Sequence, residues 1–405
     1  MSSYILALDL GSSKIKVLVA QITGPDTWQI VFPAMRKSQG IKQGMIDNLE
    51  LVIADLDNLI NEMEGANKNF IFKQATVGIN GPHLETRISK GVSVISRADG
   101  EISEDDKDRA LKAAQACVLP ANLFLAQTVV QNYTIDGITK VKDPIGLKGL
   151  RLEVECLLIN AFSPIIRNIN RLGESLGLNF RRVILPYAAA EIALSRQDKE
   201  LGAAALDLGA GTTSLCVYED NELIDLKVFG VGGNNITNDI AVGLTTSIDI
   251  AEKIKISEGF ALPKKVPKGA QIDLNQYFEE PLEDNKISKR FVAEIIEARL
   301  SEIFEMVGSR LKELNRFGKL PGGIVLFGGG AQMPFITELA KEKFKLPVRI
   351  AKPEIDWYKE VHDPSFIPVL GLIDVTFKEK LENTNLRGES VFNKLANFME
   401  RHFSL

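Results

Sequence analysis

Two short segments that lie far apart in the chain carry nearly the same run of glycines, hydroxyls and one aspartate. The first reads LDLGSSK over residues 8–14, and the second reads LDLGAGTT over residues 206–213. Glycine leaves room for a phosphate oxygen beside the backbone N–H groups, and Ser and Thr hydroxyls can donate hydrogen bonds to the same oxygens. The repetition therefore predicts two phosphate-binding turns that act on one nucleotide.

The charged residues of these segments indicate a triphosphate with magnesium. Lys14 offers a positive charge to the phosphates, whereas Asp9 and Asp207 would repel a bare polyphosphate. The carboxylates make sense if Mg²⁺ lies between them and the phosphates and is held through water, because this ion keeps most of its hydration shell. We therefore expect ATP and Mg²⁺ as cofactors, with the metal held by Asp9 and Asp207 through water.

A third glycine cluster, Gly328-Gly329-Gly330, follows an apolar strand and precedes a helix expected to begin at Met333-Pro334. Backbone N–H groups at such a helix start can face the adenine and the α-phosphate. Glu252 and Lys255 share one face of a helical stretch and could hold the ribose and cover the base, or could form a solvated ion pair. The full set of candidate nucleotide-binding residues is Asp9, Gly11, Ser12, Ser13, Lys14, Asp207, Gly209, Gly211, Thr212, Thr213, Gly232, Gly233, Glu252, Lys255, Gly328, Gly329 and Gly330.

The elements around the two turns predict a duplicated architecture. Each turn joins two apolar runs, which indicates a strand–turn–strand hairpin, and the second half of the chain repeats the first. An α+β module is expected to be inserted near residues 83–160, with its helix over about 103–116. The other expected elements are a helix with an Asp47/Glu50 capping box ending at Gly65, a strand over 71–79, helices over 163–177, 186–195 and 289–314, and a polar linker over 377–390.

Length and composition bound the class of protein. A chain of 405 residues with 45% hydrophobic residues can form two or more domains with sizeable cores. Its formal net charge of -5 argues against a nucleic-acid partner. Cys117, Cys156 and Cys216 form no CxxC motif and are expected to be reduced thiols. The N-terminus shows no basic and apolar leader, and no apolar run approaches the length of a membrane-spanning helix, so we expect a protein that is neither secreted nor transmembrane.

The last residues, 391–405, have the pattern of an amphipathic helix. Its apolar side is rich in phenylalanine, which suits the headgroup boundary of a bilayer. The pattern alone favours a terminal helix docked on the protein core. The candidate membrane residues are Phe392, Leu395, Phe398, Met399 and Phe403.

With these motifs, the chain resembles the superfamily of actin, hexokinase and the heat-shock chaperone ATPases, including its two linking helices near PYAAA (186–190) and PVLGL (368–372). Within it, the chain is similar to the FtsA family of bacterial cell-division proteins over nearly its whole length. The segments that carry this similarity are SQGIKQGMID (38–47), DPIGLKGLRL (143–152) and GGNNITNDIA (232–241).

The resemblance implies an α/β fold of duplicated actin-like (ribonuclease H-like) domains with an inserted α+β subdomain. The implied parts are subdomain 1A (1–83, 163–195 and 374–390), inserted subdomain 1C (84–162), subdomain 2A (196–227 and 305–373), subdomain 2B (228–304) and the membrane-targeting helix (391–405).

The resemblance also implies a function: an ATP-binding protein that polymerises into actin-like filaments on the inner face of the cytoplasmic membrane at the division site. The implied partners are the C-terminal peptide of FtsZ, docked on 228–304, other division proteins, membrane lipids and further copies of the chain. Bacterial actins carry a glutamate before the proline of the first linking helix. This chain has Leu185 there, and Glu191 further along is expected to face away, so ATPase activity should be weak or absent. A PilM-like pilus adaptor and a small-molecule kinase remain alternatives.

Overall fold

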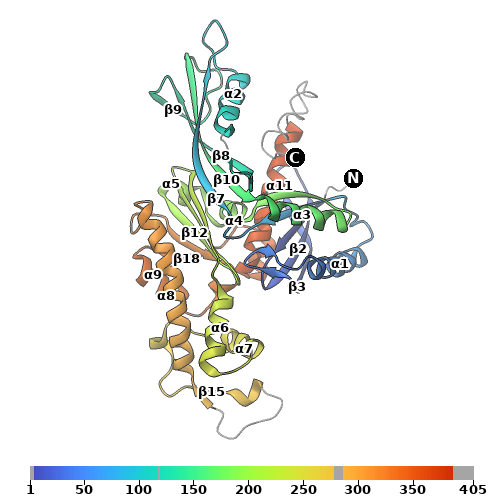
Figure 1. Cartoon of the computed structure of the whole chain (residues 1–405), viewed down its shortest axis with the longest axis vertical. Coiled ribbons are helices and arrows are strands. Elements are labelled where there is room, and N and C mark those ends of the chain that lie inside the picture. Colours follow the sequence, from blue (N-terminus) through green and yellow to red (C-terminus); the bar gives the residue numbers. More distant parts are fainter. Residues whose placement is uncertain (1–3, 117–118, 278–285, 386–405) are drawn as a thin grey trace.

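The computed structural model describes residues 4–116, 119–277 and 286–385. The molecule is elongated (Figure 1): two lobes lie side by side at its centre, one module extends from one end of the long axis, and a second module lies at the other end. Cys117 and the predicted membrane helix 391–405 fall outside the described residues. Within the described part, no helix combines the length and apolar character needed to cross a bilayer.

The first lobe is built on a five-stranded sheet in the order β11-β6-β1-β2-β3. β1 and β2 form an antiparallel hairpin, and β6 lies parallel to β1 on the other side. The elements of this lobe are β1 (Tyr4–Leu10), β2 (Lys14–Ile22), β3 (Trp28–Lys37), β4 (Ile41–Lys42), β5 (Met45–Ile46), α1 (Leu49–Ala66), β6 (Gln74–Ile79), α3 (Ser163–Ser175) and β11 (Asn179–Ile184).

The second lobe repeats this plan with a sheet in the order β14-β13-β12-β17-β18. β12 and β13 form the second hairpin, and β17 lies parallel to β12. The elements are α5 (Arg196–Leu201), β12 (Ala203–Leu208), β13 (Thr213–Glu219), β14 (Glu222–Phe229), α8 (Lys289–Glu313), β17 (Gly323–Phe327), η3 (Gly329–Gln332), α9 (Ile336–Phe344), β18 (Val348–Ile350), α10 (Asp356–Val361) and η4 (Pro364–Phe366).

Two helices lie between the sheets and join the lobes, α4 (Leu185–Ala193) and α11 (Ile367–Asn385). They pack directly on each other, and a Cβ on Gly371 would lie 2.2 Å from the carbonyl oxygen of Ala188, so only glycine permits this approach. Alternate residues of β12 belong to two apolar cores. Ala203 and Ala205 join the core that contains α4 and α11, whereas Ala204 and Leu206 join the core under α8 and α9.

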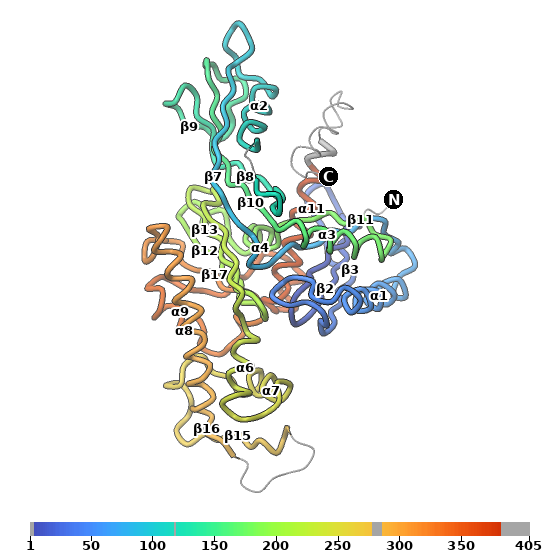
Figure 2. Tube along the Cα trace, viewed as in Figure 1, coloured from blue at the N-terminus to red at the C-terminus, as the bar shows by residue number. Residues whose placement is uncertain are grey.

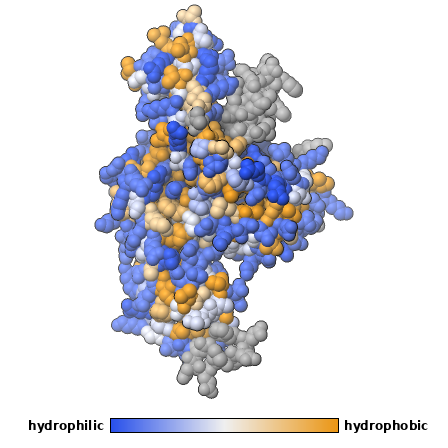
Figure 3. Space-filling model, in the orientation of Figure 1, coloured by the Kyte–Doolittle hydropathy of each residue, from blue (hydrophilic) through white to orange (hydrophobic). Residues whose placement is uncertain are grey.

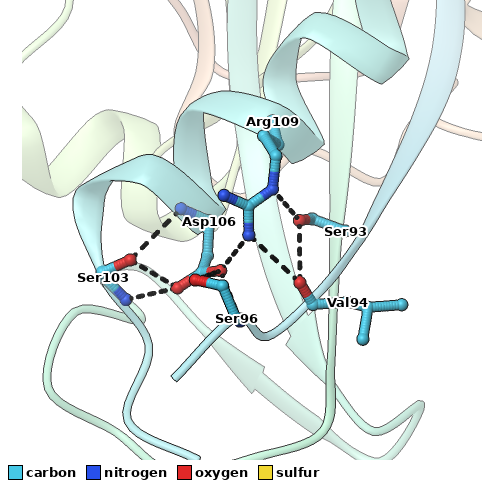
Figure 4. A network of polar contacts seen from close by, with 6 residues as sticks. All are labelled: Ser93, Val94, Ser96, Ser103, Asp106 and Arg109. Atoms are coloured by element: carbon cyan, nitrogen blue, oxygen red, sulfur yellow. Dashed lines mark hydrogen bonds and ion pairs between the residues drawn. The ribbon is translucent and has the colours of Figure 1, made fainter. Parts of the chain in front are cut away.

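The inserted module comprises β7 (Glu85–Val94), α2 (Glu104–Gln115), β8 (Leu123–Ile135), β9 (Thr139–Val141) and β10 (Arg151–Phe162), with the sheet order β7-β10-β8-β9. Buried Asp106 fastens α2 to this sheet (Figure 4). It accepts hydrogen bonds from the N–H groups of Ser103 (2.9 Å) and Ser96 (3.0 Å), and it pairs with Arg109, which also donates to Ser93. Apolar surface gathers at the outer end of the molecule (Figure 3), and Val94 and Ile138 of this module are 74% and 85% exposed.

The module at the opposite end holds the helices α6 (Gly233–Leu244) and α7 (Ile248–Glu258). It also contains η1 (Pro263–Lys265), β15 (Gln271–Asp273), η2 (Leu274–Tyr277) and β16 (Lys286–Ser288). α8 runs unbroken from this module into the second lobe, through the predicted boundary between residues 304 and 305. The domain boundaries drawn from the sequence stay predictions.

Several predicted element ends are wrong. Asn48, not Asp47, caps α1, since its side chain accepts from the N–H of Leu51, and the helix passes Gly65 to end at Ala66. α3 ends at Ser175, two residues before the expected end at Gly177, and Pro164 lies in its first turn. The strand expected over 71–79 begins only at Gln74.

Two further predicted element ends are wrong. The helix expected at Met333-Pro334 is preceded by the short η3, and α9 begins only at Ile336. The linker expected from residue 377 is helical to Asn385, because Phe377 is buried in the core and Lys380 donates to the carbonyl of Tyr4. Polar composition alone did not reveal these anchoring contacts.

Candidate functional site

The two glycine turns meet at the centre of the molecule. In the first hairpin Leu10 pairs with Ile15, and in the second Leu208 pairs with Thr213, so both turns leave their sheets at equivalent points. A Cβ on Gly211 would lie 2.5 Å from Ser12 Oγ, which places the turns in direct contact. The duplicated sequence therefore does produce two opposed turns in one place.

A cavity of about 510 Å³ opens between the lobes at these turns. It is also bordered by residues from α7, β17–η3 and η4. The predicted site residues that line it are Asp9, Gly11, Ser12, Ser13, Lys14, Asp207, Gly209, Gly211, Thr212, Gly232, Gly233, Glu252, Lys255, Gly328, Gly329 and Gly330. Thr213 does not line it, because this residue is fully buried and its hydroxyl donates to the carbonyl of Val231 at 2.8 Å.

The carboxylates of the two hairpins lie in unlike surroundings. Asp9 pairs across its hairpin with Lys16, whose Nζ lies 3.3 Å from Asp9 Oδ2, and both side chains are nearly buried. Asp207 pairs in the same register with Ser214 and gains no such cation. Burial, assisted by the negative charge of Asp9, raises the pKa of Asp207 to about 7, against a smaller opposing effect of Lys16.

The third glycine cluster, Gly328–Gly330, lies against Asp207. Gly328 has a φ of +83°, and a Cβ there would lie 2.1 Å from Asp207 Oδ1. The backbone at Gly328, just before η3, therefore passes directly beside the carboxylate, which no residue with a side chain would permit. This close approach joins β17 to the second hairpin at the cavity wall.

Glu252 and Lys255 do form the ion pair that their spacing allows, and they form it inside the cavity wall. Lys255 Nζ lies 2.6 Å from Glu252 Oε2, 2.8 Å from Thr237 Oγ1 and 3.1 Å from the carbonyl of Gly233. Glu252 also accepts from the Thr237 hydroxyl. The pair is thus fixed to the start of α6 and presents a carboxylate and an ammonium group to the same end of the cavity.

Two polar residues that the sequence did not single out bridge the lobes beside the cavity. Gln43 Nε2 donates to the carbonyl of Gly230 at 2.6 Å, and Asn80 Nδ2 donates to Thr212 Oγ1 at 3.2 Å. Asn80 lines the cavity at the end of β6, where the carboxyl ends of parallel strands commonly carry ligand groups. That position was the signal available in the sequence. For Lys16 the signal was its place opposite Asp9, between the apolar residues Ile15 and Val17.

The wall of the cavity next to α4 is apolar. Leu185 lines it, whereas Glu191 does not. Glu191 lies further along the helix and accepts from Tyr218 Oη at 2.7 Å and from Lys199 Nζ at 2.8 Å. The arrangement of these two residues agrees with the expectation that Glu191 faces away from the nucleotide.

Among solved structures, the fold resembles a chain of the "PilM-PilN type IV pilus biogenesis complex" with a TM-score of 0.61 at 16% identity, covering 91% of this chain and 97% of the other. It also resembles MreB5 of Spiroplasma citri bound to ADP, with a TM-score of 0.57 at 16% identity, covering 94% and 98%. Together with the duplicated hairpins, these likenesses define an α/β protein with the actin-like fold.

Sequence comparison narrows this class. Residues 204–371 match the family described as "Cell division protein FtsA", and residues 81–160 match the "SHS2 domain inserted in FTSA". The chain is 34% identical to the cell division protein FtsA of Neisseria meningitidis, covering 93% of this chain and 90% of that protein. It is 31% identical to that of Bacillus subtilis, covering 96% and 86%. The chain belongs to the FtsA family.

Proposed function

We propose that the chain binds ATP with Mg²⁺ in the cavity between its lobes. The observation that carries this proposal is the convergence of two hairpin turns, with carboxylates in equivalent register, on one cavity beside the Gly328–Gly330 backbone. Turns of this kind supply backbone N–H groups to phosphate oxygens. The MreB5 neighbours described as bound to ADP and to AMPPNP support a nucleotide as the ligand.

The donor set fits magnesium held mainly by water and phosphate. Asp9 and Asp207 both face the cavity, and no group of three or more His, Cys, Asp or Glu side chains suited to a metal occurs in the described ranges. Mg²⁺ bound to nucleotides usually keeps several waters and needs only one or two protein carboxylates. The metal would neutralise phosphate charge, and the two aspartates would accept hydrogen bonds from its waters.

Hydrolysis should be slow. Attack by water requires a group that orients or deprotonates it, and the position next to Pro186 is occupied by Leu185. The proposed role is therefore that of a nucleotide-controlled scaffold rather than an efficient ATPase.

The scaffold would act in cell division. Membership of the FtsA family supports a protein that assembles with further copies of itself, lies on the inner face of the cytoplasmic membrane and tethers the FtsZ ring. In this proposal the C-terminal peptide of FtsZ docks on residues 228–304, and residues 391–405 attach the chain to lipid. A single short amphipathic helix binds weakly, so assembly would strengthen attachment through many tails on one filament.

Electron microscopy on lipid monolayers tests the proposal as a whole. The full chain with ATP and Mg²⁺ should form filaments on the lipid, whereas a chain ending at Glu389 should leave the lipid bare. Omission of ATP should reduce filament formation by the full chain. Equal decoration by both chains would contradict the membrane role of the tail, and equal decoration with and without ATP would contradict nucleotide control.

Single changes in the tail sharpen the membrane test. Phe398→Glu and Phe403→Glu should each release the chain from sedimenting vesicles and leave its ATP affinity unchanged, because a charge on the apolar side opposes insertion. Asn397→Glu, on the expected polar side, is the matched control. Vesicle binding that survives both phenylalanine changes would rule out this helix as the anchor.

A further inference from the structure

The inserted module contacts both lobes, although the chain attaches it to the first lobe alone. It leaves the first lobe after β6 and returns to it through β10 and α3. β11 and β14 are the outer strands of the two central sheets, and β8 contacts both of them. The strands of the module descend between the lobes (Figure 2), on the side away from α6 and α7.

One end of β8 is held by the first lobe. The guanidinium group of Arg182, on β11, lies 5.8 Å from the centre of the Phe124 ring, on β8. Arg182 also donates to Asn170 Oδ1 at 2.6 Å, which ties the same side chain to α3. This side of the module is therefore anchored by packing and by its two covalent connections.

The other part of β8 is held by the second lobe through the free edge of β14. The buried side chain of Gln131 donates from Nε2 to the carbonyl of Leu223 at 2.9 Å. From β7, the Thr86 hydroxyl donates to the carbonyl of Leu226 at 3.4 Å. Both carbonyls belong to an outer strand that would otherwise leave them unpaired.

A third contact reaches the turn that precedes β14. Lys142 Nζ donates to the carbonyl of Asp220 at 3.4 Å and pairs with the carboxylate of Glu222. Asp220 and Asn221 have φ values of 52° and 62°, as a tight two-residue hairpin turn requires. The module thus holds a rigid corner of the second lobe as well as its edge strand.

These contacts have a consequence for movement between the lobes. The lobes are joined by α4 and α11, and the cavity lies on the side of these helices that carries α7. Rotation that opens the cavity must displace β14 relative to β11. Because β8 contacts both strands, such rotation would break the hydrogen bonds of Gln131 and Thr86 or carry the module with it.

We propose that the inserted module bridges the two lobes, and we call this bridge the strap. Its contacts with β14, made by Gln131, Thr86 and Lys142, are thermodynamically coupled to occupancy of the cavity. Ligand binding that closes the lobes stabilises these contacts, and by reciprocity a partner that separates the module from β14 weakens ligand binding. The coupling step rests on the proposed nucleotide binding, whereas the strap itself does not.

The test uses the full chain and a charge-exchange set. Lys142→Glu and Glu222→Lys each place like charges together, and the double variant restores an opposite pair. Lys140→Glu, an exposed position on neighbouring β9, is the matched control. Gln131→Leu removes the buried hydrogen bond at nearly constant volume.

Two measurements are made on each variant. Spin labels at Ile138→Cys and Leu201→Cys, in a Cys117→Ser background, report the distance between the module and the second lobe. Calorimetry reports the affinity for Mg²⁺·ATP.

We expect one narrow distance distribution for the parent chain and for Lys140→Glu. Lys142→Glu, Glu222→Lys and Gln131→Leu should broaden it and weaken Mg²⁺·ATP binding by about fivefold, and the charge-exchanged double variant should recover both properties. If the distance between the spin labels is unchanged in all three variants, the module does not bridge the lobes through these contacts. If the distance changes but the affinity for Mg²⁺·ATP does not, the contacts are not coupled to occupancy of the cavity. If the parent chain binds no nucleotide, the proposed function fails, yet the distances still decide whether the strap exists.

Discussion

The two hairpins have nearly the same sequence and the same register, yet they place their aspartates in different electrostatic surroundings. At the position opposite the aspartate, the first hairpin carries Lys16 and the second carries Ser214. Asp9 is therefore paired, whereas burial raises the pKa of Asp207 to about 7. Two carboxylates in the same register thus lie in different surroundings, one beside a cation and the other buried with a raised pKa.

The different surroundings of Asp9 and Asp207 favour different roles for the two turns. Asp9 is already paired with Lys16 at 3.3 Å, which suits a preformed contact to the proposed metal-bound water. Burial raises the pKa of Asp207, so a cation that binds with the nucleotide would favour its ionised form. The second turn would thus respond to the ligand, and the first would be ready before the ligand arrives.

The largest expected effect comes from removing the lysine that distinguishes the first hairpin. Lys16→Met should leave the buried carboxylate of Asp9 without its cation and cost about 3–5 kcal/mol of unfolding free energy, as measured by urea denaturation without nucleotide. Lys14→Met, two residues away on the same strand and exposed, should cost under about 0.5 kcal/mol. Similar costs for the two variants would show that the Asp9–Lys16 pair does not differ from a surface charge.

The second prediction concerns the pH dependence set by Asp207. Its pKa is about 7 in the folded chain and 3.8 as an ordinary carboxyl group, so the folded state binds more protons than the unfolded state between these values. Unfolding free energy should therefore fall as pH rises from about 4 to about 7, by at most about 1.4 kcal/mol per pH unit.

Asp207→Asn tests this assignment because it removes the titrating group. The parent chain without nucleotide should lose stability over that window more steeply than the variant, as followed by denaturant midpoints at constant ionic strength. At pH 8 the variant should be the more stable of the two, while its affinity for Mg²⁺·ATP should be lower. Parallel pH profiles for the two chains would show that Asp207 is ionised throughout.

The duplicated turns could be predicted from the sequence because glycine spacing, flanking apolar runs and register are all local properties. The asymmetry between them could not be read from either turn alone, since it depends on Lys16 and Ser214 lying across from the aspartates. Gln43 and Gly230 lie far apart in the chain and are brought together only by the packing of one lobe against the other. The end of α11 was missed for the same reason, because buried Phe377 and the contact of Lys380 with Tyr4 override its polar composition.

A smaller effect is expected at the end of the cavity where α7 lies, which belongs to neither hairpin. Lys255→Met should weaken ATP binding by about three- to tenfold, the cost of about one net hydrogen bond or somewhat more, because it removes an ammonium group and releases Glu252. Lys253→Met is a suitable control, since this residue lies on the same helix but does not line the cavity. Calorimetry with ATP and with free triphosphate separates the contributions: an equal loss for both ligands would contradict a role at the nucleoside.

The smallest effect on chemistry is expected at the far end of the second hairpin. Tyr218, on β13, donates its hydroxyl to Glu191 at 2.7 Å, and Lys199 holds the other carboxylate oxygen, so Glu191 anchors α4 to the hairpin rather than facing the cavity. Glu191→Ala should cost about 1–2 kcal/mol of unfolding free energy, yet leave any residual ATP hydrolysis unchanged when phosphate release is measured at saturating Mg²⁺·ATP. Tyr218→Phe is the matched variant, because it removes the same hydrogen bond and keeps the carboxylate of Glu191. If Glu191→Ala abolished hydrolysis while Tyr218→Phe preserved it, the carboxylate would have to reach the nucleotide. Glu191 would then act in the cavity together with Asp9 and Asp207, and its assignment as a structural residue would be wrong.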